Sequence, residues 1–243
     1  MTDACKTHYQ QLHRDCDAVL NESFAGSRAA SMSKSHAFIA DLALWIKELH
    51  ARPEAPALQS ALREYQFSLL ALTMGQYRAA FSALRLSLEL TFATVQWSTN
   101  ERELREWKAG TRDIVWAALA DNENGILSKQ FVRLFSEGLA DEAPGYRATA
   151  ATVYRECSEY VHGNANTHSA LPQRIEFDAA SFSGWHAKAS SVRLTSSFAL
   201  AARYLTDFDV DARSRLEAMI LDHLGHSAGI RALLGAPAEA VGG

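Results

Sequence analysis

The chain has 243 residues, of which 48% are hydrophobic and 21% are charged, and this is enough for one large buried core. Its formal net charge is −4 and its pI is about 6.1. This balance argues against a protein that coats nucleic acid nonspecifically, but it does not exclude an enzyme with a small basic cleft.

The sequence predicts a cytoplasmic protein with no signal peptide and no membrane contact. Residues 1–10 are polar and charged, and no apolar stretch follows them. The most apolar run, 84–97, is interrupted by Arg85 and Glu89 and is shorter than the roughly 18 residues of a membrane span. The three cysteines provide no disulfide framework.

The residue pattern predicts an almost entirely helical chain, because helix-forming residues dominate, proline is scarce and β-branched runs are absent. Glycine and proline mark the breaks. The predicted helices are 3–20, 30–50, 57–73, 76–98, 101–120, 124–138, 146–162, 179–206 and 211–224, with a short turn or helix at 227–234. The stretch 162–177 lacks helical periodicity, and its residues 175–177 suit a short extended piece.

These elements predict an all-α, single-domain antiparallel helical bundle with peripheral helices. The domain spans 1–234, with a core of about 57–206, and the Ala/Gly/Pro-rich tail 235–243 is expected to be disordered. The helices 57–73 and 76–98 are expected at the centre, because their apolar residues recur at i, i+3 and i+4.

A charged pair stands inside the second of these central helices. Arg85 and Glu89 are four residues apart among leucines. Charges in so apolar a helix must be paired if they are partly buried, so we expect an ion pair here.

The most suggestive pattern lies near residue 160. Arg155 and His162 are seven residues apart, which places both on one face of a helix that Gly163 would end. A permanent cation beside a group that titrates near neutral pH suits phosphate chemistry, with Arg155 holding phosphate oxygens and His162 as general acid or base. The alternative is local helix chemistry, in which Arg155 pairs with Glu159 and His162 caps the helix.

The run Arg155-Glu156-Cys-Ser-Glu-Tyr-Val-His162, at a helix end in an all-α chain, resembles the motif of the HEPN superfamily (higher-eukaryote and prokaryote nucleotide-binding domains). The phrase Ser158-Glu-Tyr-Val-His162-Gly163 is similar to the helix end of several bacterial HEPN-like families. Arg85 and Glu89 match an Arg and a Glu that often stand on the preceding helix of such families. Two features depart from active members: six residues separate Arg155 from His162, and the residue after the arginine is acidic.

The resemblance implies a homodimer that cleaves RNA without a metal or other cofactor, as part of a bacterial toxin or antiphage defence system. It implies attack by the ribose 2′-hydroxyl, with His162 handling the proton and Arg155 stabilising the phosphorane charge. The implied supporting residues are Glu159, Asn164, Glu89 and Arg85. Partners would be RNA as substrate, a second copy of the chain, and an antitoxin or defence-system protein. The competing hypothesis is a HEPN-like dimerisation, scaffold or nucleotide-sensing protein without activity.

Two other patterns favour structural roles. Cys5-x-x-His8 and His13-x-x-Cys16 look like zinc ligands, but on one helix Cys5 and Cys16 would lie about 16 Å apart, too far for a single zinc ion. The acids between Asp207 and Asp211 lack the remaining residues of a calcium loop and suit the capping of the helix that follows. Cys157 is expected in the core.

Overall fold

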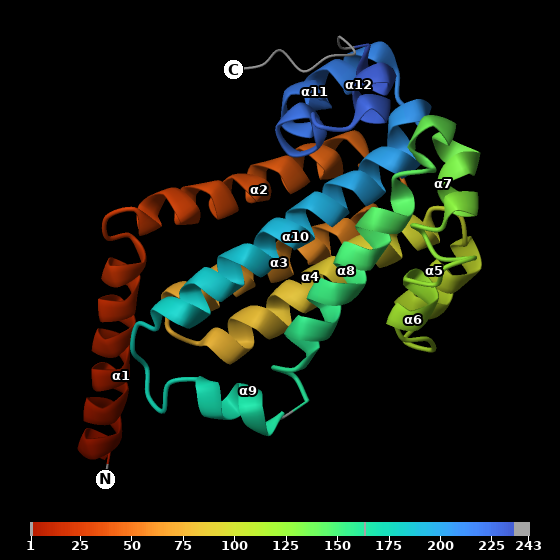
Figure 1. Cartoon of the computed structure of the whole chain (residues 1–243). Coiled ribbons are helices and arrows are strands. Elements are labelled where there is room, and N and C mark those ends of the chain that lie inside the picture. The colour runs from red at the N-terminus through yellow and green to blue at the C-terminus, as the bar shows by residue number, and fades with distance from the viewer. Residues whose placement is uncertain (1, 163, 236–243) are drawn as a thin grey trace.

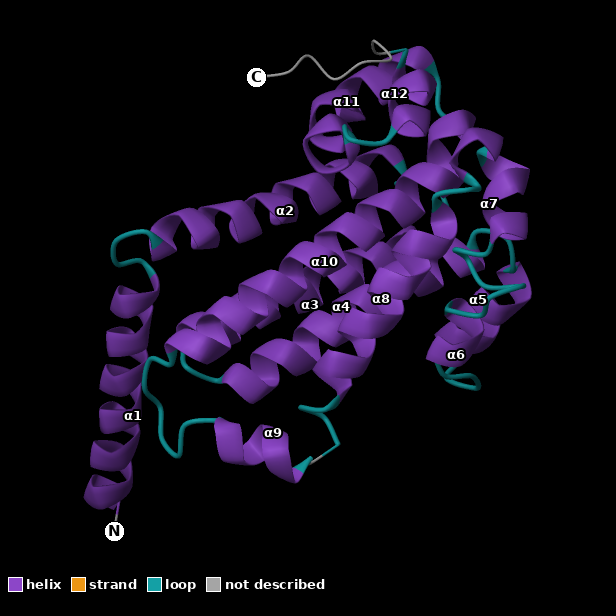
Figure 2. Cartoon of the chain, in the orientation of Figure 1, coloured by secondary structure: helices purple, strands orange, loops and turns teal. Residues whose placement is uncertain are grey.

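The computed structural model describes residues 2–162 and 164–235, and this part of the chain contains helices and no strand (Figures 1 and 2). The fold is therefore all-α, as the sequence predicts. The helices are α1 (Thr2–Ser23), α2 (Arg28–Glu48), α3 (Ala55–Thr73), α4 (Tyr77–Trp97), α5 (Glu101–Lys108), α6 (Trp116–Leu119), α7 (Lys129–Phe135), α8 (Ala143–Ser158), α9 (Ala165–Ala170), α10 (Ala179–Tyr204), α11 (Val210–Leu224) and α12 (Ala228–Leu234), with short 3-10 helices at Glu137–Leu139 and Leu205–Asp207.

The centre of the bundle is the antiparallel pair α3 and α4. These helices pack along most of their length, because a tight turn at Gly75 reverses the chain between them. Helices α2, α8 and α10 complete the bundle, and α10 packs against α4, α8 and α2 (Figure 1). The prediction that 57–73 and 76–98 form the central helices is confirmed to within two residues at each end.

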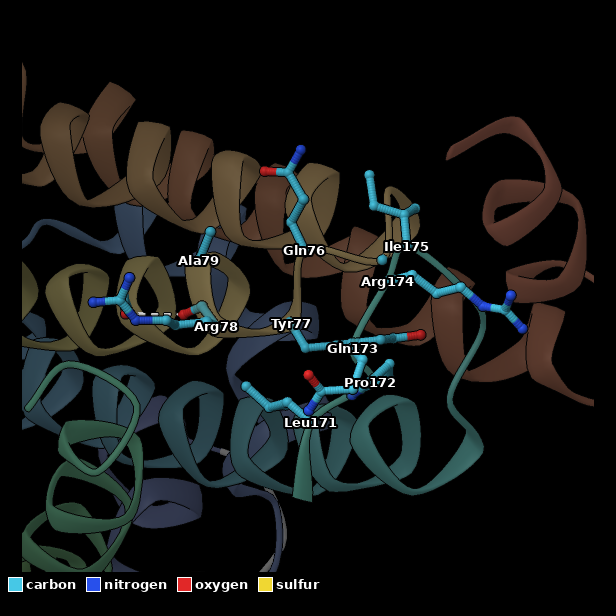
Figure 3. Close-up of a pocket in the computed structure, with 11 residues that line it drawn as sticks. Gln76, Tyr77, Arg78, Ala79, Leu171, Pro172, Gln173, Arg174 and Ile175 are labelled. Atoms are coloured by element: carbon cyan, nitrogen blue, oxygen red, sulfur yellow. Dashed lines mark hydrogen bonds between the residues drawn. The ribbon is translucent and has the colours of Figure 1, made fainter. Parts of the chain in front are cut away.

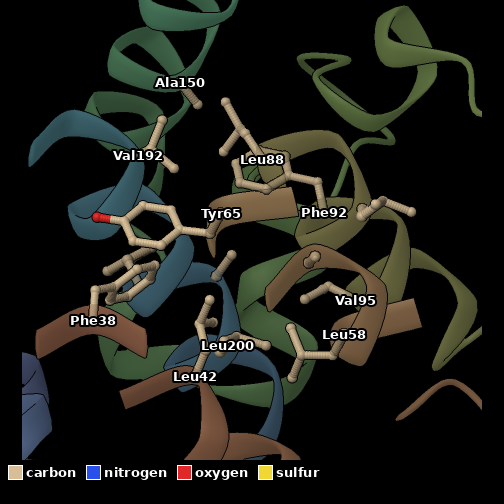
Figure 4. Close-up of a cluster of buried hydrophobic side chains, with 14 of the residues drawn as sticks. Phe38, Leu42, Leu58, Tyr65, Leu88, Phe92, Val95, Ala150, Val192 and Leu200 are labelled. Atoms are coloured by element: carbon tan, nitrogen blue, oxygen red, sulfur yellow. The ribbon is translucent and has the colours of Figure 1, made fainter. Parts of the chain in front are cut away.

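The core lies where these five helices meet. Phe38 of α2, Tyr65 and Phe92 are fully buried there, with the Phe38 and Tyr65 rings 5.1 Å apart, and Figure 4 shows them with leucine and valine side chains from α3, α4 and α10. Close packing of apolar side chains from each of these five helices makes the bundle one continuous core.

The remaining helices surround this bundle. Helix α1 extends away from the end of α2, α11 and α12 cover the opposite end, and α5, α6 and α7 lie along one side (Figure 1). Helix α9 lies beyond the ends of α4 and α8. None of the helices in the described ranges is long and apolar enough to cross a membrane.

The prediction of one helix over 101–120 is wrong. Helix α5 ends at Lys108, because Gly110 adopts φ +70 and the N–H of Thr111 donates to the Glu106 carbonyl at 3.0 Å, which closes a Schellman motif. The prediction for 124–138 is also too long, since its first residues are turns before α7.

The stretch 162–177 also differs from the prediction. It contains the short helix α9, and residues 175–177 form no strand. Gly163, which was expected to end the preceding helix, lies outside the described residues, and so does 236–243 of the predicted disordered tail.

Candidate functional site

Helix α8 and the turns that follow it carry the predicted catalytic pair. Pro144 stands in its first turn, where a missing N–H costs nothing. The buried residues Tyr146, Ala150, Val153 and Cys157 recur at helical spacing and hold one face of α8 against the bundle. The opposite face is therefore left open to solvent.

The helix ends at Ser158, four residues earlier than predicted. The chain continues in turns, and the N–H of His162 still donates to the Ser158 carbonyl at 3.2 Å, as it would in one further helical turn. Because this bond has the i to i−4 spacing of an α-helix, the backbone before His162 stays close to the helical path that was predicted for it.

Arg155 and His162 are both exposed. Within residues 2–162 and 164–235, neither the Arg155 guanidinium nor the His162 imidazole has a hydrogen-bond or ion-pair partner. The alternative in which Arg155 pairs with Glu159 is thus not what the structure shows. Glu159 instead accepts a hydrogen bond from Thr167 Oγ1 of α9 at 3.4 Å.

Glu156, the acidic residue that departs from the resemblance, is paired with a lysine. Its carboxylate lies 2.9 Å from Lys188 Nζ of α10. The pair compensates the negative charge next to Arg155 and ties α8 to α10. Asn164 is exposed, at the start of the chain that leads into α9.

Arg85 and Glu89 form the ion pair that the sequence predicts, and they share it with a tyrosine. Arg85 Nη2 lies 3.1 Å from Glu89 Oε1, with side-chain exposures of 18% and 11%. The Tyr154 hydroxyl donates to the same carboxylate oxygen at 2.9 Å and also contacts the Arg85 guanidinium. Burial raises the pKa of Glu89, while the charge of Arg85 and the Tyr154 hydrogen bond oppose that rise.

Aromatic rings enclose this pair. The Arg85 guanidinium lies 4.5 Å from the centre of the Tyr154 ring, and that ring stacks on Trp116 of α6 at 4.0 Å. Trp116 in turn stacks on Phe92 of α4 at 5.3 Å. The pair therefore belongs to the packing between α4, α6 and α8, and no contact joins it to the side chains of Arg155 or His162 within the described ranges.

Two residues that the sequence analysis did not single out support the end of α8. The Tyr160 ring stacks on Phe81 of α4 with ring centres 3.9 Å apart. Arg78, in the first turn of α4, donates from Nε to the Tyr160 carbonyl at 3.0 Å. The Arg78 guanidinium is therefore held against the backbone of Tyr160, two residues before His162.

A separate polar cluster lies inside the bundle, between α2, α3 and α10. Ser35 Oγ lies 2.8 Å from His186 Nδ1 and accepts a hydrogen bond from Arg193 Nη1 at 3.1 Å. Burial, together with the charge of Arg193, lowers the pKa of His186 to about 4. Trp185, next to His186 in the sequence, is fully buried and donates to Ser68 Oγ at 2.9 Å.

The other candidate residues have structural positions. Cys157 is in the core, and burial raises the pKa of its thiol to about 12. Asp209 caps α11 by accepting from the Ala212 N–H at 2.7 Å. Helix α1 is continuous from Cys5 to Cys16, and the described ranges contain no group of three His, Cys, Asp or Glu side chains that could hold a metal ion.

The fold and the site together define an all-α bundle with an exposed arginine in the last turn of α8 and an exposed histidine in the turns that follow it. Comparison of the chain with models of protein families, with characterised proteins and with solved structures found no match.

Proposed function

We propose that the chain is a HEPN-like endoribonuclease that cleaves RNA by in-line attack of the ribose 2′-hydroxyl, with Arg155 and His162 as its catalytic residues. The observation that carries the proposal is the state of these two side chains. Both are exposed, and neither is engaged by another residue of the described ranges. An arginine used for helix stability would be expected to bind the carboxylate four residues away.

In the proposed reaction His162 takes the proton from the 2′-hydroxyl. The 2′-oxygen then forms a bond to phosphorus, the bond from phosphorus to the 5′-oxygen breaks, and that oxygen leaves with a proton from water. The hydroxide that remains takes the proton from His162, which returns the imidazole to its starting form. The products are a 2′,3′-cyclic phosphate and a free 5′-hydroxyl. Arg155 stabilises the negative charge on the phosphorane, because its planar fork fits two phosphate oxygens at once.

A second copy of the chain would complete the site. Charge stabilisation is strongest where water is excluded, yet Arg155 and His162 lie on an open surface in the single chain. The resemblance also implies that such motifs meet near a dimer interface. We therefore propose a homodimer in which the ends of the two α8 helices face each other, acting in a bacterial toxin or antiphage defence system with an antitoxin or another partner protein.

The pairing of Arg85 with Glu89 and Tyr154 favours a second candidate function. It gives two of the four proposed supporting residues a role in packing rather than catalysis. In that case the chain is a HEPN-like scaffold or nucleotide-sensing protein, and Arg155 and His162 bind a ligand without chemistry.

A growth assay in a bacterial host tests the proposal. Induced wild-type protein is compared with Arg155→Ala and His162→Ala at matched soluble expression, and total RNA is examined alongside. Arg63→Ala and His36→Ala are matched controls, because both residues are exposed and lie on α3 and α2. We expect growth arrest and RNA fragmentation for wild type and controls, and a loss of cleavage of about 100-fold or more for the two site variants.

Purified protein gives the second readout, since the fragments should end in a 2′,3′-cyclic phosphate. Cleavage that persists in both site variants would refute the assignment of the catalytic pair. Intact RNA for every variant, both in cells challenged with phage and with purified protein, would favour the non-enzymatic candidate.

A further inference from the structure

A groove of about 600 Å³ lies beside the end of α8. One side is formed by residues 75–79 and Ser82, and the other by residues 171–175, and we call it the α4 groove (Figure 3). It lies beside the chain segment that leads to His162, because Arg78 of the groove donates to the carbonyl of Tyr160, two residues before His162. Its volume is in the range of sites that hold small organic ligands.

The charged side chains that line the groove are positive, which suits an anionic ligand. None of the described residues that line it is Asp or Glu, although the chain carries a net charge of −4. Arg78 and Arg174 line it and extend in opposite directions in Figure 3. Arg174 is bound to Glu176 at 2.8 Å, whereas Arg78 has no carboxylate partner within residues 2–162 and 164–235. Arg78 is therefore the cation that remains available for a ligand.

Arg78 is also held in place. Its Nε donates to the Tyr160 carbonyl, which restrains the guanidinium while leaving the two terminal nitrogens free to donate. A planar fork with free terminal donors binds a phosphate through two hydrogen bonds. The amide side chains of Gln76 and Gln173 supply further polar groups along the groove, and Leu171 and Pro172 supply apolar surface.

The two sides of the groove are fixed relative to each other. The buried Tyr77 hydroxyl donates to the Glu176 carbonyl at 3.2 Å and accepts from the Asp178 N–H at 2.7 Å. At Gly75 the chains approach so closely that a β-carbon would lie 3.3 Å from Ile175 Cγ2. A groove with fixed sides binds its ligand at a lower ordering cost.

We propose that the α4 groove binds a single RNA strand next to the cleavage site, with Arg78 holding a backbone phosphate and the Leu171 and Pro172 surface receiving a base. This inference rests on the proposed function, because it takes the RNA from that function. A nucleic-acid strand alternates phosphates with bases. Arg78 and the two amides can bind its phosphates, and the apolar side can bind a base. The contact of Arg78 with Tyr160, two residues before His162 in the sequence, would let such a strand continue to the catalytic pair.

The test measures RNA binding without cleavage, in the His162→Ala protein. A 5′-fluorescein single-stranded RNA of about eight nucleotides is titrated by fluorescence anisotropy at two salt concentrations. Arg78→Ala should raise the dissociation constant about tenfold and reduce the salt slope by about one, as expected for one lost phosphate contact. Arg63→Ala, an exposed arginine on α3, should leave both unchanged.

A second pair of variants tests the groove without changing charge. Gln173→Trp fills the groove and should weaken RNA binding, while Gln66→Trp on the exposed side of α3 should not. Far-ultraviolet circular dichroism shows that each variant is folded. Adenosine monophosphate, added as a competitor, separates a strand-binding groove from a site for free nucleotides.

The outcomes separate this inference from the proposed function. If the parent binds no RNA, or if Arg78→Ala and Gln173→Trp bind RNA as the parent does, the groove assignment is overturned, even when wild-type protein cleaves RNA through Arg155 and His162. Binding of the monophosphate that depends on Arg78, without binding of the oligonucleotide, also overturns it. If wild-type protein cleaves no RNA and oligonucleotide binding still depends on Arg78, the proposed enzyme fails and the groove assignment stands.

Discussion

Replacing Glu89 by alanine should destabilise the protein by about 3 kcal/mol, because it leaves Arg85 charged and partly buried with no carboxylate. The Coulomb attraction across their 3.1 Å separation is about 5 kcal/mol at an effective dielectric constant of roughly 20. The cost of burying both charges offsets much of this attraction in the native protein. Removing one partner removes the attraction but keeps the burial cost of the other, and the Tyr154 hydroxyl also loses its acceptor.

The measurement is urea unfolding followed by circular dichroism, analysed as a two-state transition. Glu101→Ala is a matched control, because Glu101 also forms an ion pair with an arginine four residues away, Arg105, but with side-chain exposures of 64% and 78%. Its loss should cost at most about 1 kcal/mol. The two variants therefore differ mainly in the burial of the pair that each one breaks.

The double variant Arg85→Met/Glu89→Leu completes the test. It removes both charges together, so its free energy of unfolding should lie closer to that of the wild type than Glu89→Ala does. A cost below about 1 kcal/mol for Glu89→Ala, or a double variant less stable than the single one, would falsify the view that this pair is held by burial.

Two further predictions concern other buried groups. The pKa of His186 is lowered to about 4, so the unfolded chain binds a proton more readily, and the free energy of unfolding should fall as pH decreases below the ordinary histidine value. After allowance for the partial exposure of His186, the free energy of unfolding should fall by about 1 to 2 kcal/mol between about pH 7 and about pH 4.5, measured by urea unfolding. His186→Gln should abolish this decrease. An equal pH dependence in the variant would contradict the assignment to His186. Of the three cysteines only Cys5 is exposed, and burial raises the pKa of both Cys16 and Cys157, so a thiol reagent should label one cysteine per folded chain and all three after denaturation. Fast labelling of Cys157 in the folded chain would show that the α8 face is not packed as described.

The long helices could be predicted from the sequence, because each buries a face whose apolar residues recur at helical spacing. The helix over 57–73 was predicted within two residues of α3 for this reason. The helix over 101–120 was not, because Gly110 ends α5 in a left-handed backbone and residues 111–115 stay non-helical until α6 begins at Trp116. Local preference alone does not show where such a glycine will end a helix.

In the candidate site, too, contacts between residues close in the sequence could be predicted and contacts between distant residues could not. The Arg85–Glu89 pair is local, four residues apart in an apolar helix, and it could be predicted. Two other contacts depend on how α4 packs against α8. Tyr154 bonds to Glu89, which is 65 residues away in the sequence, and Arg78 bonds to Tyr160, which is 82 residues away. The sequence pattern contains no signal for a contact across that distance.

The Tyr77 hydroxyl has a consequence for how this fold can diversify. Its bonds to Glu176 and Asp178 attach the chain to the bundle just before α10, and the end of α8 is attached by Arg78 and Phe81. Leu171 packs against the core from within this segment, but residues 164–170 contribute no buried side chain among those described, so we expect insertions and deletions there to leave the core unchanged. The same segment forms one side of the α4 groove, so related chains can acquire new ligand preferences by varying a single surface loop while keeping the stability of the bundle.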